Sequence, residues 1–153
     1  MVVSGNGLDD TDKAIIRELQ VDGRIPHAQL ASRIGMSEAA TRQRVKRLID
    51  RGVMEVVAVT DPLALGAGLQ AMLAITVETD ARVIAEQISE LAEVDYVVLT
   101  SGRADILCEV VCNDNTHLLE LVNGGIREIR GVRTVEVSTY LRLLKQTYSW
   151  GTG

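Results

Sequence analysis

The second half of the chain runs twice through one order of elements: strand, helix, strand. In each copy a β-branched and aliphatic run is followed by a segment with apolar residues at helical spacing, and then by another strand-like run. The first copy covers residues 69–78, 79–93 and 94–101, and the second covers residues 104–113, 115–130 and 132–145. Two tandem βαβ units joined by a short turn predict a ferredoxin-like βαββαβ domain of the α+β class.

The predicted strand at 104–113 is apolar on both faces. One face carries Ile106, Cys108, Val110 and Cys112. The other face still carries Leu107 and Val111, beside Glu109. The two helices of the domain can cover only one face of the sheet, so we expect a second subunit to cover the other and form a homodimer through this domain. The alternative is a monomer with an unusually apolar exposed sheet.

Three helical segments precede this domain. The first begins among the aspartates that follow Leu8 and ends near Gly23. The second follows Pro26, which favours a helix start, and ends at Gly35, which can adopt the left-handed conformation. Short apolar stripes at helical spacing predict that both helices bury one side.

The third helix is predicted from a cap at Ser37 to a stop at Gly52. Its inner stripe is expected to be Val45, Leu48 and Ile49. The tight turn between the second and third helices is typical of a helix-turn-helix. The β-branched run at 53–61 favours a strand or small wing, and the glycines and proline that follow favour a hinge. We therefore expect a winged helix-turn-helix domain at 1–60, a hinge at 61–68 and the ferredoxin-like domain at 69–153.

Charge is distributed unevenly along the chain, whose formal net charge is -5. Residues 1–60 hold nine Lys and Arg against eight Asp and Glu, which gives +1, and residues 61–153 hold seven against thirteen, which gives -6. The third helix alone carries five cations: Arg42, Arg44, Lys46, Arg47 and Arg51. This pattern predicts that the third helix, expected to leave most of these cations outside, binds a polyanion, and its place in a helix-turn-helix identifies that polyanion as double-stranded DNA.

A helix that enters the major groove reads base edges with its first turns and contacts phosphates further along. The predicted base-contacting residues are Ser37, Glu38, Ala39, Thr41 and Arg42. Arg42 can pair with guanine, Glu38 with cytosine, and Ala39 or Thr41 can contact a thymine methyl group. The predicted phosphate contacts are Arg44, Lys46, Arg47 and Arg51.

The first half of the chain contains a series of short motifs: Leu8-Asp9, Asp12, Ile15-Ile16, Leu19, Gly23-Arg24, Leu30-Ala31, Gly35-Met36-Ser37, Arg44-Val45, Leu48 and Gly52-Val53. Together they resemble the amino-terminal signature of the Lrp/AsnC family of feast/famine transcription regulators. The resemblance extends to the βαββαβ half, which is similar to that family's effector-binding domain. It implies a DNA reader joined to a ligand sensor, dimers made through the second domain, and octamers built from four dimers.

The same resemblance implies an amino-acid effector at the contact between dimers, near a Gly-x-x-Asp turn that is Gly102-Arg103-Ala104-Asp105 in this chain. Such a pocket needs partners for a carboxylate and an ammonium group. Arg103 can bind the carboxylate and Asp105 the ammonium. Hydroxyl contacts are predicted from Thr100, Ser101, Ser138 and Tyr140. The alternative is that these residues serve only turn and strand-edge chemistry, with Gly102 present for its backbone freedom.

Other classes of protein are less well supported by the sequence. No apolar run is long enough for a membrane helix and no export signal is visible, so we expect a cytoplasmic protein. The two cysteines are too far apart on one strand for a disulfide, the histidines lack metal-ligand spacing, and no metal or cofactor is expected. Two alternatives to a regulator remain: an architectural DNA-compacting protein, and an enzyme like the tetrapyrrole decarboxylases that resemble this family. We expect no enzyme, because no catalytic motif is apparent.

Overall fold

The computed structural model describes residues 7–61, 64–66 and 68–146. These residues fall into two compact units, one built mainly from residues before Thr60 and the other from Thr60–Leu144. Each unit is described by itself. The predicted hinge at 61–68 lies partly outside the described residues, because 62, 63 and 67 are not among them.

Among the described residues, the first unit contains three helices, α1 (Asp10–Val21), α2 (His27–Ile34) and α3 (Glu38–Asp50). Asp9 caps α1 and forms a reciprocal capping box with Asp12. Gly35 ends α2 in the left-handed conformation with φ of 70°, as the sequence predicts. A small apolar cluster joins the three helices: Ile15, Ile25, Leu30, Val45 and Leu48. The helix-turn-helix prediction is confirmed.

Residues 53–61 contain no strand, so the predicted wing is not formed within this chain. Val56, Val57 and Val59 are exposed instead. Their β-branched side chains favour extended backbone, but a strand also needs a neighbouring strand for its hydrogen bonds. The described residues of the first unit supply no such strand.

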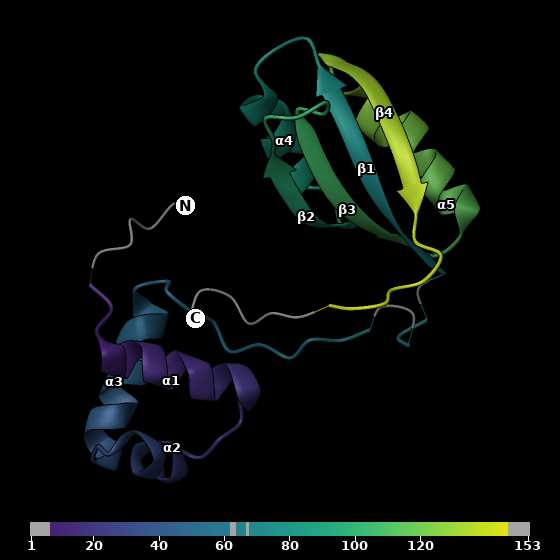
Figure 1. The fold of residues 1–153 in the computed structure, drawn as a ribbon. Coiled ribbons are helices and arrows are strands. Elements are labelled where there is room, and N and C mark those ends of the chain that lie inside the picture. The colour runs from purple at the N-terminus through teal and green to yellow at the C-terminus, as the bar shows by residue number, and fades with distance from the viewer. Residues whose placement is uncertain (1–6, 62–63, 67, 147–153) are drawn as a thin grey trace. The chain divides into compact units, whose positions relative to one another are not determined.

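The second unit is an antiparallel four-stranded sheet in the order β2-β3-β1-β4, covered on one side by α4 and α5 (Figure 1). Its elements are β1 (Leu69–Val77), α4 (Ala81–Ser89), β2 (Val94–Leu99), β3 (Ile106–Cys112), α5 (Asn115–Glu120) and β4 (Val132–Thr139). This order matches the predicted ferredoxin-like α+β fold. The helix predicted at 115–130 is shorter than expected. After α5 the chain changes to a π-turn (η1, Leu121–Gly125) and a 3-10 turn (η2, Ile126–Glu128), where two glycines occur.

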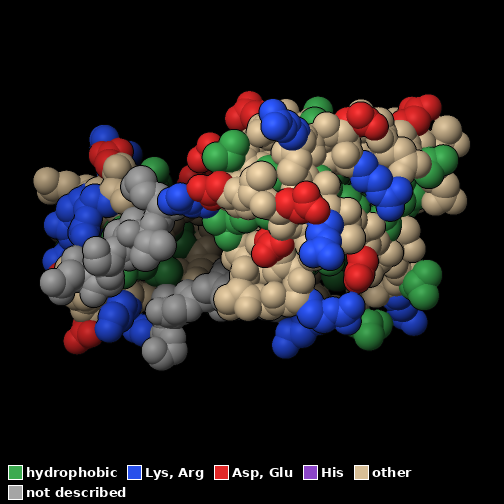
Figure 2. Space-filling model, turned by 90° about the horizontal axis from the view of Figure 1, so that it is seen from above, with side chains coloured by type: hydrophobic (Ala, Val, Ile, Leu, Met, Phe, Trp, Pro, Cys, Tyr) green, Lys and Arg blue, Asp and Glu red, His purple; other side chains and the backbone are tan. Residues whose placement is uncertain are grey.

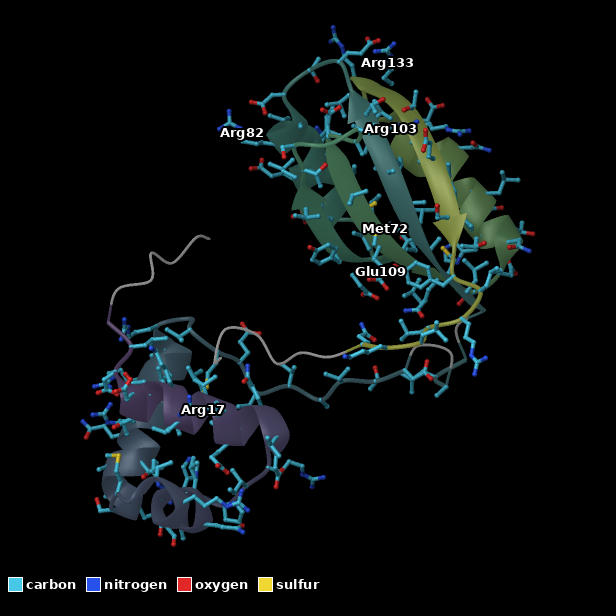
Figure 3. The ribbon with its side chains drawn as sticks, viewed as in Figure 1. Arg17, Met72, Arg82, Arg103, Glu109 and Arg133 are labelled. Carbon is cyan, nitrogen blue, oxygen red and sulfur yellow. The ribbon has the colours of Figure 1, made fainter. Side chains whose placement is uncertain are left out.

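Strand alternation places the core of the second unit between the sheet and its helices. Leu73, Ile75 and Cys108 are completely buried there, packed with Ile84 and Ile88 of α4. The opposite face of β3 carries Leu107, Glu109 and Val111, all half-buried. Figure 3 shows Met72 and Glu109 on the two central strands of the sheet. The sheet thus has one covered face and one open, partly apolar face.

Candidate nucleic-acid interface and effector site

The third helix of the first unit is positioned by its own cap and by its buried side. The Ser37 hydroxyl oxygen accepts the backbone N–H of Ala40 at 3.3 Å. Thr41, Val45 and Leu48 are buried, and Val45 and Leu48 belong to one apolar cluster with Ile15 of α1 and Leu30 of α2. With 3.6 residues per turn, this buried stripe leaves Ala39, Gln43 and Lys46 on the opposite, outward side.

The cations of α3 lie on two different flanks of the helix. Arg42 and Lys46 lie on one flank, four residues apart, with side chains 65% and 75% exposed. They form surface pairs with Glu38 and Asp50 at 2.8 and 2.5 Å. Exposed pairs of this kind contribute little stability, so both cations can exchange their partner for a phosphate.

The other flank of α3 carries Arg44 and Arg47, which contact the start of α1. Arg44 donates to the carboxylates of Asp9 at 2.6 Å and Asp12 at 2.8 Å, and its side chain is only 25% exposed. Arg47 donates to Asp12 at 3.1 Å and is 49% exposed. The hydrogen bond from Arg44 lowers the pKa of Asp9, and Asp9 in turn raises the pKa of Arg44. The prediction that the cations of this helix stand outside is therefore wrong for Arg44.

Two further sequence predictions for α3 need correction. Thr41, predicted to reach a thymine methyl group, is completely buried and donates its hydroxyl to the carbonyl oxygen of Ser37 at 3.0 Å. It completes the inner stripe in place of Ile49, which is 41% exposed. The reason is the phase of the helix, because the buried direction passes through positions 41, 45 and 48.

The remaining predicted DNA residues are on the surface of the first unit. Ser37, Glu38, Ala39 and Arg51 are all exposed. Sequence reasoning overlooked Gln43, which is exposed on the outermost line of α3. Its amide can read adenine bidentately. A helical phase counted from Thr41 rather than from Ile49 was the signal that could have identified it.

The β2–β3 turn is the predicted centre of the effector site, and it is tightly hydrogen-bonded. The backbone N–H of Thr100 donates to the backbone carbonyl oxygen of Asp105 at 2.9 Å, and the Thr100 hydroxyl donates to the backbone carbonyl oxygen of Ala104. The Asp105 carboxylate accepts the backbone N–H of Val77 at 2.8 Å through Oδ2. One carboxylate oxygen is thus used to tie the turn to β1, which leaves Oδ1 for other contacts.

Arg103 and Ser101 project from this turn into solvent. The Arg103 side chain is 95% exposed, and its guanidinium lies 3.7 Å from a carboxylate oxygen of Glu136 on β4. Ser101 and Gly102 are also exposed. An exposed guanidinium with one weak partner is available to an anion, but the residues described in one chain form no enclosed pocket around it.

The structure does not bring Ser138 and Tyr140 to this turn within one chain. The turn lies beside the end of β1, because the N–H of Asp105 donates to Ile75. Ser138 lies opposite Met72 in the β1–β4 register, and the backbone N–H of Tyr140 donates to the backbone carbonyl oxygen of Gln70, so both lie toward the other end of β1. Figure 3 shows the same separation between Arg103 and Met72. Burial, and then the nearby Glu109, raise the pKa of Tyr140.

Other kinds of site find little support in the described residues. Cys108 and Cys112 are buried free thiols, and no group of His, Cys, Asp and Glu side chains there has a metal-binding arrangement. None of the described helices has the length and apolar character needed to cross a membrane. Figure 2 shows acidic and basic side chains interspersed over the face of the molecule that it presents.

Comparison with known proteins identifies the family from both halves of the chain. Residues 8–49 match the AsnC-type helix-turn-helix domain, and residues 69–153 match the C-terminal dimeric α+β barrel domain of AsnC-type transcription regulators. The chain belongs to the Lrp/AsnC family of transcription regulators. Its DNA-binding half and its dimeric C-terminal domain are both family features.

Curated relatives in the Lrp/AsnC family match nearly the whole chain. An uncharacterised HTH-type transcriptional regulator of Pyrococcus abyssi is 34% identical over 146 residues, which cover 94% of this chain and 90% of the relative. The HTH-type transcriptional regulator LrpA of Pyrococcus horikoshii is 30% identical over 140 residues, covering 90% and 99%. These relatives are named as transcriptional regulators and not as enzymes, which agrees with the absence of catalytic motifs from the sequence.

Solved Lrp/AsnC structures show the same fold. The leucine response regulatory protein LrpA of Mycobacterium tuberculosis is 30% identical with a TM-score of 0.82, covering 93% of this chain and 98% of its own. A transcriptional regulator of Neisseria meningitidis, solved as a complex with L-Met, is 26% identical with a TM-score of 0.81, covering 95% and 97%.

Proposed function

We propose that this Lrp/AsnC protein is a sequence-specific DNA-binding regulator in the cytoplasm whose assembly responds to a small-molecule effector of the amino-acid class. Its dimers present two copies of α3 to half-sites about one helical turn apart, or a multiple of that spacing. The effector acts by binding one assembly or arm geometry more tightly than another, because only differential affinity shifts such a balance.

The outward line of α3 carries the DNA part of this proposal. Ala39, Gln43 and Lys46 form the outermost line, with Arg42 beside it and the capped first turn in front. This arrangement combines groups that read bases, an amide and a guanidinium, with an ammonium that neutralises phosphate. A helix presenting both kinds of group suits specific recognition, whereas an architectural protein needs only the cations.

Removing the exposed flank tests the interface directly. The double variant Arg42→Ala and Lys46→Ala deletes two cations without touching the buried stripe. We expect about tenfold or greater loss of affinity for duplex DNA, with the slope of log K against log salt reduced by about 0.9 for each phosphate that the variant no longer neutralises. The measurement is fluorescence anisotropy across a salt series.

Arg82→Ala is the matched control, because Arg82 is an equally exposed cation, 75% exposed, on α4 of the second unit. It should leave both affinity and slope unchanged. Wild-type binding by the double variant would contradict the proposed interface.

Gln43→Ala tests base reading separately from charge. The variant keeps every cation, so non-specific affinity should remain at the wild-type level. Affinity for a duplex selected from a random library by the wild-type protein should fall by about five- to a hundredfold, the range expected when one bidentate pairing with a base is removed. An unchanged ratio of specific to non-specific affinity would show that Gln43 does not take part in base recognition.

The effector part of the proposal is supported by the L-Met complex of the Neisseria relative and by the exposed guanidinium at the β2–β3 turn. Because the described residues of one chain leave Arg103 95% exposed, we propose that a second dimer completes the site, as in an assembly of four dimers. Ser138 and Tyr140 belong to this site only if a neighbouring subunit brings them to the turn.

Thermal-shift screening against the common amino acids tests this directly, since a ligand that prefers the native state raises the melting temperature. Arg103→Ala should abolish the shift, and Arg133→Ala, an exposed arginine near the same end of the sheet, should retain it (Figure 3). A shift that survives Arg103→Ala would place the effector elsewhere.

A further inference from the structure

A ring of ion pairs and capping hydrogen bonds ties the start of α1 to one flank of α3. Asp12 Oδ1 accepts from Arg44 Nη1 at 2.8 Å and from Arg47 Nη2 at 3.1 Å. Arg44 Nη1 also donates to Asp9 Oδ2 at 2.6 Å. The backbone N–H of Asp12 donates to Asp9 Oδ1 at 2.7 Å, and the backbone N–H of Asp9 donates to Asp12 Oδ2 at 3.4 Å.

Asp12 is the centre of this ring, and it is buried. Its side chain is only 2% exposed. A buried carboxylate is costly unless charged partners and hydrogen bonds satisfy it, and here both charged partners come from α3, 32 and 35 residues away. The position of Asp12 in α1 therefore constrains where the two guanidinium groups of α3 lie.

The two arginines use this carboxylate differently. Arg44 is 25% exposed and directs a single nitrogen, Nη1, at both aspartates, so it is enclosed between the helices. Arg47 is 49% exposed, and within the described chain its ion pair is made through Nη2 alone. A guanidinium has five N–H donors in one plane, so Arg47 keeps donors that its pair with Asp12 does not use, on a side chain that is half exposed.

We propose that Asp12 is a positioning residue of the DNA interface. Its buried carboxylate holds one edge of the Arg47 guanidinium so that the other edge meets a DNA phosphate, while Arg44 serves as an internal strut between α1 and α3. This inference rests on the proposed DNA-binding function of α3. It divides the two arginines into one that contacts DNA and one that does not.

The sign of the effect separates this inference from simple electrostatics. Asp12→Asn removes a negative charge near DNA, which by long-range attraction alone should tighten binding. The proposal expects the opposite: binding about three- to tenfold weaker, with a salt slope shallower by about 0.9 for each DNA-bound subunit. Asp10→Asn is the matched control, because Asp10 is an exposed residue in the same helical turn. It should leave binding unchanged or slightly tighter.

A double-mutant cycle on the full-length protein then tests whether Asp12 acts through Arg47. Arg47→Ala should reproduce the weaker binding and shallower slope, and Asp12→Asn combined with Arg47→Ala should add no further loss. Arg44→Met should lower the melting temperature but keep the salt slope. Additive losses in the cycle, or a wild-type slope in Arg47→Ala, would overturn the proposal.

A merely structural role for Asp12 predicts a different result. In that case Asp12→Asn lowers the melting temperature but binds DNA like wild type wherever circular dichroism shows it folded, and this outcome also overturns the proposal. If Asp12→Asn is unfolded at the assay temperature, Arg47→Lys replaces it, because it keeps the charge and loses the planar fork. A threefold or greater loss of affinity supports the proposal, and wild-type affinity and slope overturn it.

Two sets of results distinguish a wrong DNA interface from a wrong role for Asp12. Wild-type DNA binding by the Arg42 and Lys46 double variant contradicts the interface itself. Weakened binding in that variant, together with unaffected binding in Asp12→Asn and Arg47→Ala, contradicts only the positioning role.

Discussion

The two units of the chain are stabilised in different ways. The apolar cluster of the first unit contains five buried side chains among the described residues, and the unit also buries a carboxylate, Asp12, and a hydroxyl, Thr41. The apolar cluster of the second unit is much larger and extends across three strands and both helices, with aliphatic and thiol side chains throughout. In the described chain, every side-chain polar atom that is buried has a hydrogen-bond partner.

This difference has a functional consequence. A three-helix unit of this size buries too little apolar surface to be rigid through packing alone, so its helices are also fixed by charges. The charges that fix α3 are neighbours of those proposed to contact DNA. The second unit depends less on such charges, because a larger apolar core holds its sheet. Substitutions that destabilise the first unit should therefore also weaken DNA binding, whereas the stability of the second unit should not depend on the charges of the DNA interface.

The largest expected effect is in the second core. Leu73 lies on the central strand β1 and is completely buried. Leu73→Ala should reduce the free energy of unfolding by about 3–5 kcal/mol, because the sheet and helices around the cavity cannot collapse fully. Urea unfolding at fixed protein concentration measures it. Val83→Ala on α4, where Val83 is 53% exposed, should change stability by less than about 0.5 kcal/mol.

Thiol labelling shows which unit has opened. Both cysteines of the chain lie on β3, and burial raises the pKa of Cys108 to about 11, so the native thiol is rarely ionised. Leu73→Ala should accelerate labelling of Cys108 because the second unit opens more often. An unchanged labelling rate would show that labelling of Cys108 does not require the core of the second unit to open.

A matching truncation in the first unit should have a somewhat smaller effect on stability and a larger one on DNA binding. Leu48 is completely buried between the three helices. Leu48→Ala should cost about 2–4 kcal/mol and abolish DNA binding near physiological temperature, while Cys108 labelling stays at the wild-type rate. Ile49→Ala is the control and should cost less than about 1 kcal/mol, because Ile49 is 41% exposed.

The contrast between Leu48 and Ile49 also shows how far the sequence could predict this structure. Helix and strand positions followed from periodicity, because each element buries a repeating set of side chains. Gly35 and Ser37 gave the ends of two helices, since a left-handed glycine and a capping hydroxyl act locally. The βαββαβ order was predicted for the same reason, from repeats in the sequence.

Features that depend on contacts between distant residues were not predicted. The pairing of Arg44 and Arg47 with Asp12 joins residues more than thirty positions apart, and nothing in the local pattern indicates it. Thr41 is predicted to contact a base because it lies in the first turns of the helix, but it is buried, and its hydroxyl is satisfied by the preceding turn of its own helix. The wing predicted at 53–61 also depended on a distant contact. β-Branched residues favour extended backbone, but they do not indicate whether a neighbouring strand is present to pair with.

The cap of α3 should have a smaller effect, and it can separate stability from binding. Ser37→Ala removes the acceptor for the N–H of Ala40 and should cost about 1 kcal/mol. Ser37→Asp keeps a capping oxygen and should retain stability, but its charge faces the DNA and should weaken binding. Thermal melts and anisotropy on the same two variants measure both effects. Equal DNA affinity in both would mean that position 37 lies away from the phosphates.

The smallest expected effect is a dependence of stability on acid pH that differs in its source between the units. In the first unit, the hydrogen bond from Arg44 lowers the pKa of Asp9 below its usual value of 3.8. In the second, the hydrogen bond from His117, with 2.9 Å between His117 Nε2 and Glu93 Oε1, lowers the pKa of Glu93 below 4.5. A carboxyl whose folded pKa is lowered contributes stability above its unfolded pKa and loses that contribution as pH falls through the folded value.

Both contributions should therefore be complete at pH 6 and decline below about pH 4–5. Asp9→Asn should lower the melting temperature at pH 6 and approach the wild-type value near pH 3, because acid protonates the wild-type carboxyl as well. Glu93→Gln should behave in the same way, but DNA affinity at pH 6 should change only in Asp9→Asn, where the ring of ion pairs around Asp12 is disturbed. A difference in melting temperature that stays constant from pH 6 to pH 3 would show that neither carboxylate charge stabilises its unit, and would leave only packing to separate the two.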